Sequence, residues 1–309
     1  MSEYSPVRVA VSARSLFNLD ESHEIFLRDG PDAYVAHMRA HTDSVLEPGP
    51  VLPLMRALLH LNTLVPADRP IIDPVIVSSI HPGGALRIDR SLAHHGVAVK
   101  RASFTGGSPT LPILKAYGVD LFLSRSANDV QQAVNAGIAA AQMHGFADVG
   151  HLGDDFQFKI AIDGDAVIFH DASERIYQNG GKEHGLSDFL AHETLMALEP
   201  LGEGPFAKLL YKIAAIQAGA FANGRKPFRI ILVTARGGPA RERVLRTFEA
   251  WKLEPDESHF LSGFKKAGII AATGAHVFFD DQWSHVELAS AVVSSGHVPW
   301  ISDETASAA

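Results

Sequence analysis

Short apolar runs alternate with longer amphipathic stretches along the chain. The short runs are rich in Val, Ile, Leu and Phe, a composition typical of strands buried on both faces of a parallel sheet. In the longer stretches, apolar residues recur at helical spacing. This alternation predicts an α/β fold with mainly parallel sheets. The expected strands lie at 7–12, 74–79, 119–124, 159–164, 229–234 and 276–281, and the expected helices at 52–62, 128–145, 205–220 and 240–253.

The two halves of the chain resemble each other. The segment AVSARSLFNL at 10–19 corresponds to AIDGDAVIFH at 161–170, at an offset of 151 residues. Further identities follow while the offset drifts slowly to 156, as short insertions would make it do. We therefore predict two similar Rossmann-like units, 1–150 and 151–309, from an internal duplication, with a chance similarity of two βαβ segments as the alternative. The matched residues include Asp20 with Asp171, Gly49-Pro50 with Gly204-Pro205, Phe104 with Phe260 and Gly107 with Gly263.

Composition limits the chemistry. The formal net charge of −8 argues against a general binder of nucleic acid or anionic membranes, because those partners favour a basic surface. The chain has no cysteine, which excludes disulfides, thiol nucleophiles and thiolate metal sites. The sequence shows neither a signal-peptide pattern nor a run of about 18 apolar residues. We therefore expect a cytoplasmic protein whose chemistry uses oxygen and nitrogen groups.

Two aspartates follow an expected strand in the second half. Asp163 and Asp165 in IAIDGDAV are two residues apart, so along a strand they point to the same side. At the carboxyl end of a strand they would face the crevice where α/β sheets bind ligands. Two close carboxylates repel each other, and an oxygen-only pair suits Mg²⁺. By itself, the Asp-Gly-Asp segment also fits an ordinary turn.

Other strand ends in the second half add polar groups. Thr234 ends RIILVT and offers a hydroxyl, with a helix N-cap as the alternative role. HVFFDD ends in Asp280 and Asp281, which are costly at the end of a buried strand unless they meet a cation or solvent. GFKKAGII places Lys265 and Lys266 at the expected start of a helix, with a solvated lysine pair as the alternative.

The motif order Asp-x-Asp, Thr, Lys and Asp-Asp resembles the four motifs of the haloacid-dehalogenase-like (HAD-like) superfamily. Longer phrases make nearly the whole chain similar to the cytosolic type I 5′-nucleotidases, namely AVSARSLF, FTGGSP, LKAYGVDLFLS and FDDQWSHV. The resemblance implies a HAD-like fold. It also implies a Mg²⁺-dependent phosphomonoesterase that acts on nucleoside 5′-monophosphates, with AMP and related nucleotides as expected substrates.

The resemblance implies a role for each motif. Asp163 would attack phosphorus and form an aspartyl-phosphate. Asp165 would protonate the leaving ribose oxygen and then take a proton from the hydrolytic water. Thr234 and Lys266 would hold the phosphoryl oxygens, and Lys265 is the alternative to Lys266.

The implied Mg²⁺ site combines carboxylates from two motifs. Its ligands would be Asp163, the backbone carbonyl of Asp165, and Asp280 with Asp281 beside it; either of the last two could be the direct ligand. Arg236, in the LVTAR motif, is expected to bind substrate. His285 follows the acidic pair and could lie near the site, although a surface or helix-start position fits it equally well.

The first half lacks all four acids. Ser12 and Arg14 stand where the second half has Asp163 and Asp165, and Ser124 with Arg125 replaces the Asp280 and Asp281 pair. An exchange of acids for serine and arginine would convert a cation site into one suited to anions.

We hypothesise that Arg14 and Arg125 bind a phosphate or help to hold the nucleotide. Ser78 and the FTGGSP loop, at Thr105 and Gly106, are the expected neighbours. The alternative is a packing scaffold with solvated arginines.

Two other functions remain open from the sequence. One is a HAD-type phosphatase for sugar phosphates or another small phosphomonoester, and the other is a nucleotide-binding regulatory protein with little turnover. The intact acid set of the second half favours the enzyme. The apolar helices are compatible with packing inside the chain or between copies in a homo-oligomer.

Overall fold

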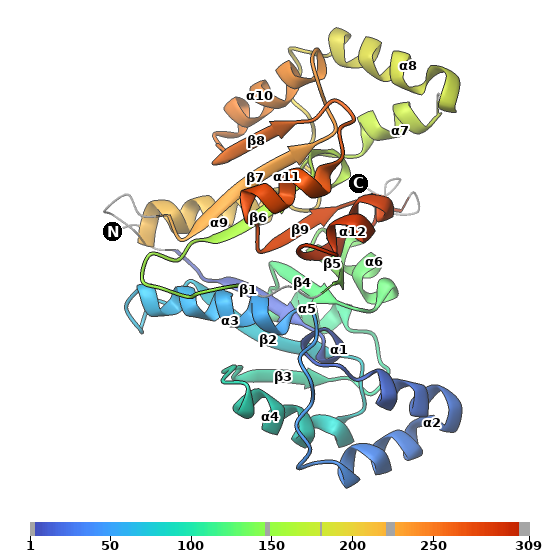
Figure 1. The fold of residues 1–309 in the computed structure, drawn as a ribbon, viewed down its shortest axis with the longest axis vertical. Helices are drawn as coiled ribbons and strands as arrows, with labels where there is room; N and C mark the ends of the chain where they lie inside the picture. The colour runs from blue at the N-terminus through green and yellow to red at the C-terminus, as the bar shows by residue number, and fades with distance from the viewer. Residues whose placement is uncertain (1–3, 146–148, 180, 221–225, 303–309) are drawn as a thin grey trace.

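A single sheet runs through the whole molecule (Figure 1). The computed structural model describes residues 4–145, 149–179, 181–220 and 226–302. Within these residues the strand order is β3-β2-β1-β4-β5-β10-β9-β6-β7-β8. The strands are β1 (Val7–Val11), β2 (Ile72–Ser78), β3 (Arg101–Phe104), β4 (Leu121–Ser124), β5 (Ala139–His144), β6 (Phe158–Ile162), β7 (Phe228–Thr234), β8 (Glu257–Phe260), β9 (Val277–Asp280) and β10 (Ser294–His297).

Helices connect the strands and confirm the predicted α/β class. Helix α2 is divided by Gly30, at φ 86°, and Pro31, which lacks the N–H that would continue the helical hydrogen bonds. The helices are α1 (Ala13–Leu16), α2 (Asp20–Ala40), α3 (Leu52–His60), α4 (Ala85–His94), α5 (Leu111–Tyr117), α6 (Ala127–Asn135), α7 (Ala172–Asn179), α8 (Gly181–Leu195), α9 (Ala207–Ala220), α10 (Ala240–Trp251), α11 (Lys266–Thr273) and α12 (Trp283–Ala289). Short 3₁₀ turns lie at Leu61–Leu64 and Pro82–Gly84, and a tight turn with a π-type hydrogen bond lies at Gly164–Ile168.

The two halves of the sheet have the same strand order. The order β3-β2-β1-β4-β5 in the first half becomes β8-β7-β6-β9-β10 in the second, and the two sets meet at the antiparallel pair of β5 and β10. The other neighbouring strands pair in parallel. In Figure 1, β1 to β4 lie in the lower part of the molecule and β6 to β9 in the upper part. The structure thus repeats one arrangement twice, while the origin of the repeat in a duplication stays a prediction.

The β5–β10 pair, called here the seam, brings the ends of β4 and β9 near each other. Across it, Ser124 is in register with Gln142, Gln142 with His297, and His297 with Asp280. Three strand spacings therefore separate Ser124 from Asp280, about 14 Å in the plane of the sheet. The ends of β1 and β6 are five spacings apart, about 24 Å. Each half consequently has its own carboxyl edge, the place where α/β sheets bind ligands, and this edge is called here its crevice.

The six predicted strands are confirmed, with ends shifted by up to two residues. The predicted helix at 128–145 is wrong in its second part. Helix α6 ends at Asn135, Gly137 adopts φ 73°, and 139–144 form β5. Alanines favour helices in isolation, but here small side chains are needed at the seam. A Cβ on Gly296 of β10 would lie 2.7 Å from the Cβ of Ala141.

One apolar core extends across both halves. Helix α9, from the second half, packs against β1, from the first. Side chains from the two halves, including Val7, Leu54, Leu209 and Phe228, line the same small apolar cavity. The predicted boundary at residue 150 falls between β5 and β6, yet the buried core continues across it.

Candidate active site

The second-half candidates gather at the carboxyl ends of β6, β7 and β9. Asp163 follows β6, Thr234 ends β7, Asp280 ends β9, and Lys266 is the first residue of α11. All four are buried, with at most 4% of each residue exposed. Parallel strands bring their carboxyl ends to one edge, so residues more than 100 positions apart in sequence share one crevice.

A tight turn positions the first acid. The Gly164 N–H donates to Asp163 Oδ1 at 2.7 Å, and Ala166 adopts φ 58°, a left-handed conformation that is uncommon for any residue except glycine. The chain can turn back so sharply because Gly204 lies beneath the loop. A Cβ at Gly204 would lie 2.4 Å from the carbonyl oxygen of Phe169.

Three carboxylates form an acidic triad. Asp163, Asp280 and Asp281 each place one oxygen within 4.8 Å of the others, and all three residues are buried. Trp300 Nε1 donates to Asp281 Oδ2 at 2.6 Å, and His285 Nδ1 lies 3.2 Å from both carboxylate oxygens of Asp280. An oxygen-only donor set of this kind fits a hard divalent cation.

Lys266 lies between two acids of the triad. Its Nζ is 2.8 Å from Asp163 Oδ1 and 2.6 Å from Asp280 Oδ2, whereas Lys265 is exposed. Burial acts to lower the pKa of Lys266, but the charges of Asp163 and Asp280 outweigh it and raise that pKa above its usual value. The lysine is therefore a fixed positive charge in the site.

The triad carries more negative charge than Lys266 compensates. Burial, together with the charges of Asp280 and Asp165, raises the pKa of the Asp163 carboxyl to about 7 against the opposing charge of Lys266. Burial also acts to raise the pKa of Asp280, but Lys266 and His285 bring it below its usual value. Once all three carboxylates are ionised, they and the one ammonium leave two negative charges, which is the charge that one divalent cation neutralises. The donor chemistry thus fits Mg²⁺.

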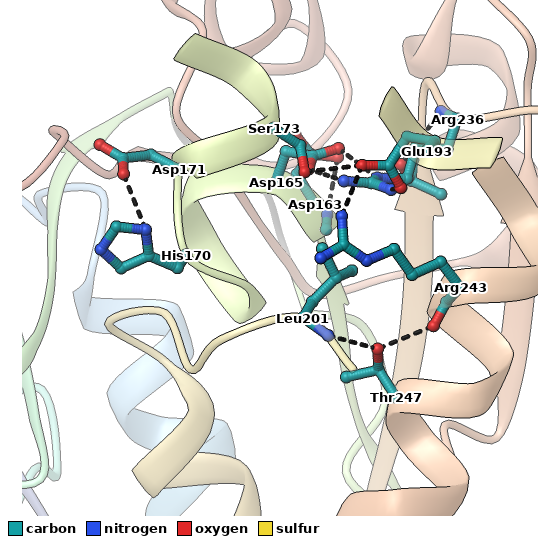
Figure 2. A network of polar contacts seen from close by, with 12 residues as sticks. Asp163, Asp165, His170, Asp171, Ser173, Glu193, Leu201, Arg236, Arg243 and Thr247 are labelled. Carbon is teal, nitrogen blue, oxygen red and sulfur yellow. Dashed lines mark hydrogen bonds and ion pairs between the residues drawn. The ribbon is translucent and has the colours of Figure 1, made fainter. Parts of the chain in front are cut away.

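Asp165 faces a second polar network, shown in Figure 2. Arg236 binds it with two hydrogen bonds, from Nε to Oδ2 at 2.8 Å and from Nη2 to Oδ1 at 2.6 Å. The remaining nitrogen, Nη1, pairs with Glu193. The carboxylate of Asp165 is not part of the acidic triad.

Glu193 of α8 is the centre of this network. Its carboxylate is fully buried and accepts from Ser173 Oγ at 2.8 Å and from Arg243 Nη1 at 2.9 Å, besides Arg236. Figure 2 shows Ser173, Arg236 and Arg243 converging on it. The network therefore ties α7, α8 and α10 to the loop that contains Asp165.

Arg236, expected to bind substrate, has its guanidinium nitrogens engaged by Asp165 and Glu193 and is 2% exposed. Burial acts to lower its pKa, but Asp165 and Glu193 raise it above the usual value. A contact between Arg236 and substrate would require one of these pairs to open.

The first-half candidates lie in the other crevice. Arg14 Nη2 and Arg125 Nη1 both approach Asp20 Oδ1 at 3.3 Å. Ser78 Oγ accepts from the Ala13 N–H at 3.3 Å, and the carbonyl oxygen of Ser78 accepts from the Thr105 N–H at 2.9 Å. Gly106 follows in the same loop, at φ 59°. With about 24 Å between Ser12 and Asp163, a phosphate bound at one crevice does not reach the other.

Sequence reasoning missed four residues around the site. Glu193 and Arg243 form the network behind Asp165; Trp300 and His297 hold Asp281, the latter through Nε2 at 2.9 Å from its carbonyl oxygen. These contacts join segments 16 to 50 residues apart, and nothing local in the sequence marks them. Of these four residues, Trp300 was the most noticeable in the sequence, because the chain has only three tryptophans.

The mainly parallel sheet, with a buried cluster of acids and one lysine at its carboxyl edge, defines an α/β protein with residues there that could hold a metal ion. Its fold is consistent with the HAD-like fold. The chain matches the 5′-nucleotidase family model over residues 2–305 and belongs to that family. The predicted resemblance is therefore confirmed.

A human relative, cytosolic 5′-nucleotidase 1B, is 34% identical over 290 residues. The matched region covers 91% of this chain and 47% of the relative, so the chain spans about half the length of that protein. No solved structure matches the chain. Among the described residues, no helix has the length and apolar character needed to cross a membrane.

Proposed function

We propose that this protein is a Mg²⁺-dependent 5′-nucleotidase that hydrolyses AMP-like nucleoside 5′-monophosphates to nucleoside and phosphate. The observation that supports this most is the cluster of Asp163, Lys266 and Asp280. The Lys266 ammonium lies within 2.8 Å of one carboxylate oxygen of Asp163, the proposed nucleophile, and of one of Asp280, a proposed cation ligand. Membership of the 5′-nucleotidase family supports the same reaction.

Asp163 is the proposed nucleophile. A phosphomonoester dianion repels a carboxylate, so its charge must be offset before in-line attack on phosphorus. Mg²⁺ held by Asp163, Asp280 and Asp281 would neutralise part of this charge. Lys266 Nζ donates to the phosphoryl oxygens. Thr234 Oγ1 already accepts from the Arg236 N–H at 3.1 Å, so its hydroxyl hydrogen is available to the same oxygens.

Asp165 is the proposed acid and base. When Asp163 bonds to phosphorus, the bond from phosphorus to the ribose 5′ oxygen breaks, and Asp165 protonates that oxygen. Asp165 then takes a proton from the water that hydrolyses the aspartyl-phosphate, which releases phosphate and restores Asp163. Since Arg236 binds both oxygens of Asp165, at least one of these bonds opens before the carboxyl can donate its proton.

Phosphate release from a panel of monophosphates tests this proposal, with and without Mg²⁺. The Asp163→Asn variant should lose turnover, while Asp154→Asn, a matched change at an exposed aspartate before β6, should retain it. Release without metal, or full activity of Asp163→Asn, would refute the mechanism. Turnover of sugar phosphates but not of nucleotides would keep the mechanism and change the substrate.

We also propose a cytoplasmic location, because the similar human protein is named as a cytosolic 5′-nucleotidase. Fractionation of cells that express a tagged chain tests this, and recovery in the membrane pellet would contradict it.

A further inference from the structure

The first half has a counterpart for each polar residue of the candidate active site. Val11 pairs with Leu123 as Ile162 pairs with Phe279, so the next residues, Ser12 and Ser124, correspond to Asp163 and Asp280. Ser78 pairs with Phe104 as Thr234 pairs with Phe260. The strand register thus assigns these equivalences independently of the sequence identities.

The loops after β3 and β8 extend the correspondence to the lysine. Gly106 and Gly107 have positive φ angles, as do Ser262 and Gly263. The Thr105 N–H donates to the carbonyl oxygen of Ser78, as the Leu261 N–H donates to that of Thr234. Thr110 stands three residues after Gly107, and Lys266 stands three residues after Gly263. Each lies at the start of a helix.

The first-half crevice is therefore lined by four hydroxyls. Three of them stand where the candidate active site has charged groups, and Ser78 stands where it has the hydroxyl of Thr234. Ser12, Ser78, Thr110 and Ser124 are at most 7% exposed. Thr110 Oγ1 is fully buried, makes no hydrogen bond within the described chain, and does not cap its helix. A buried hydroxyl without a partner is costly, so an oxygen ligand in the crevice would satisfy it.

Two arginines follow these serines in the chain, Arg14 two residues after Ser12 and Arg125 directly after Ser124. Arg14 and Arg125 share one carboxylate, that of Asp20, whose side chain is 48% exposed. Both contacts are 3.3 Å, longer than the 2.7–2.9 Å typical of charge-assisted hydrogen bonds. Arg14 Nε is buried and makes no hydrogen bond within the described residues. The two arginines thus retain donors and one positive charge for a further anion.

We propose that this crevice binds a phosphate oxyanion without a metal ion. Ser78 and Thr110 donate to its oxygens, and Arg14 and Arg125 exchange part of their contact with Asp20 for contact with the anion. Its distance from Asp163, about 24 Å, makes it a site separate from the active site. The inference does not depend on the nucleotidase reaction.

Calorimetric titration of inorganic phosphate tests the site. The protein carries Asp163→Asn and is kept in EDTA, so that hydrolysis and metal-dependent binding are both removed. We expect one phosphate per chain. Thr110→Val, which keeps the side-chain shape, should weaken binding about 3-fold to 10-fold, and Arg14→Ala or Arg125→Ala at least about tenfold. Arg56→Ala, at an exposed position of α3, is the matched arginine control.

Several results would overturn the inference. These are no binding in EDTA, an unchanged Kd in Thr110→Val and in both arginine variants, or binding lost only in Lys266→Met, which would place the phosphate in the second half. Thr110→Val keeps the test valid if an arginine variant does not fold. A parallel titration with AMP identifies the source, because binding of AMP shows that a phosphate ester is accepted, and binding of inorganic phosphate alone shows a site for the free ion.

Discussion

Replacing Lys266 by methionine removes the one ammonium group between Asp163 and Asp280. Methionine keeps most of the length of the side chain but removes the Nζ that lies 2.8 Å from Asp163 Oδ1 and 2.6 Å from Asp280 Oδ2, so two buried carboxylates lose this counter-charge. Loss of one preorganised donor to a developing charge costs about 2.7–4 kcal/mol in the transition state. Breaking a buried ion pair costs about 3–5 kcal/mol in stability. We therefore expect kcat to fall about 10²-fold to 10³-fold.

The matched control is Lys265→Met. It makes the same chemical change one residue earlier, at a side chain exposed to solvent. Steady-state phosphate release should show kcat near that of the parent chain for Lys265→Met and the full loss for Lys266→Met. Thermal melting of both variants, with and without Mg²⁺, separates folding from catalysis. A cation relieves the repulsion between Asp163 and Asp280, so the rise in Tm caused by Mg²⁺ should be larger in Lys266→Met than in the parent.

Equal activity in the two lysine variants would refute the assignment of Lys266. A loss in Lys266→Met that Mg²⁺ restores completely would show that the lysine only balances charge and does not contact the phosphoryl group. A loss of kcat that persists at saturating Mg²⁺, in a protein that melts cooperatively, is the result that the geometry requires.

Two further predictions concern stability. Glu193→Gln replaces the carboxylate shared by Arg236 and Arg243 with an amide, so we expect the free energy of unfolding, measured in urea, to fall by about 3–5 kcal/mol. The control is Glu242→Gln, at an exposed ion pair with Arg246, which should lower it by at most about 1 kcal/mol. Burial lowers the pKa of His276 to about 4, so its contribution is full above pH 6.5 and is lost as the pH falls from 6.5 to 4. After allowance for its partial exposure, this loss is about 1–2 kcal/mol. His276→Asn, whose amide oxygen can still accept from the Lys159 N–H, should remove this slope, and an unchanged slope would contradict the assignment.

The six predicted strands, and the acids at the ends of two of them, were predictable because both are local properties of the sequence, whereas β3, β5, β8 and β10 were not predicted. A run such as RIILVT is apolar enough to be buried on both faces, and a polar residue after such a run must lie at the edge of the sheet. Parallel order then brings Asp163, Thr234 and Asp280 together. Lys266 was preferred over Lys265 only through the family resemblance, and burial of one but not the other became visible in the structure.

Contacts between distant segments could not be predicted. The 128–145 segment is rich in alanine and has helical spacing, so its change from α6 to β5 depends on packing against Gly296 rather than on its own propensity. The contact of Arg236 with Asp165 and Glu193 depends in the same way on the path of α8. In both cases the decisive partner lies far away in the sequence.

The seam gives the first half a part in the active site even though it lacks the acids. His297 at the end of β10 and Trp300 just beyond it hold Asp281, and β10 has only two neighbours in the described sheet, β9 and β5. Without β5, β10 would become an edge strand, and its position relative to Asp280 would depend on β9 alone. At the seam, Ala141 lies so close to Gly296 that there is no room for a methyl group on Gly296. The absence of the proposed catalytic acids from the first half is therefore compatible with a requirement for its fold, because the acidic triad of the second half is held by a strand that pairs with it.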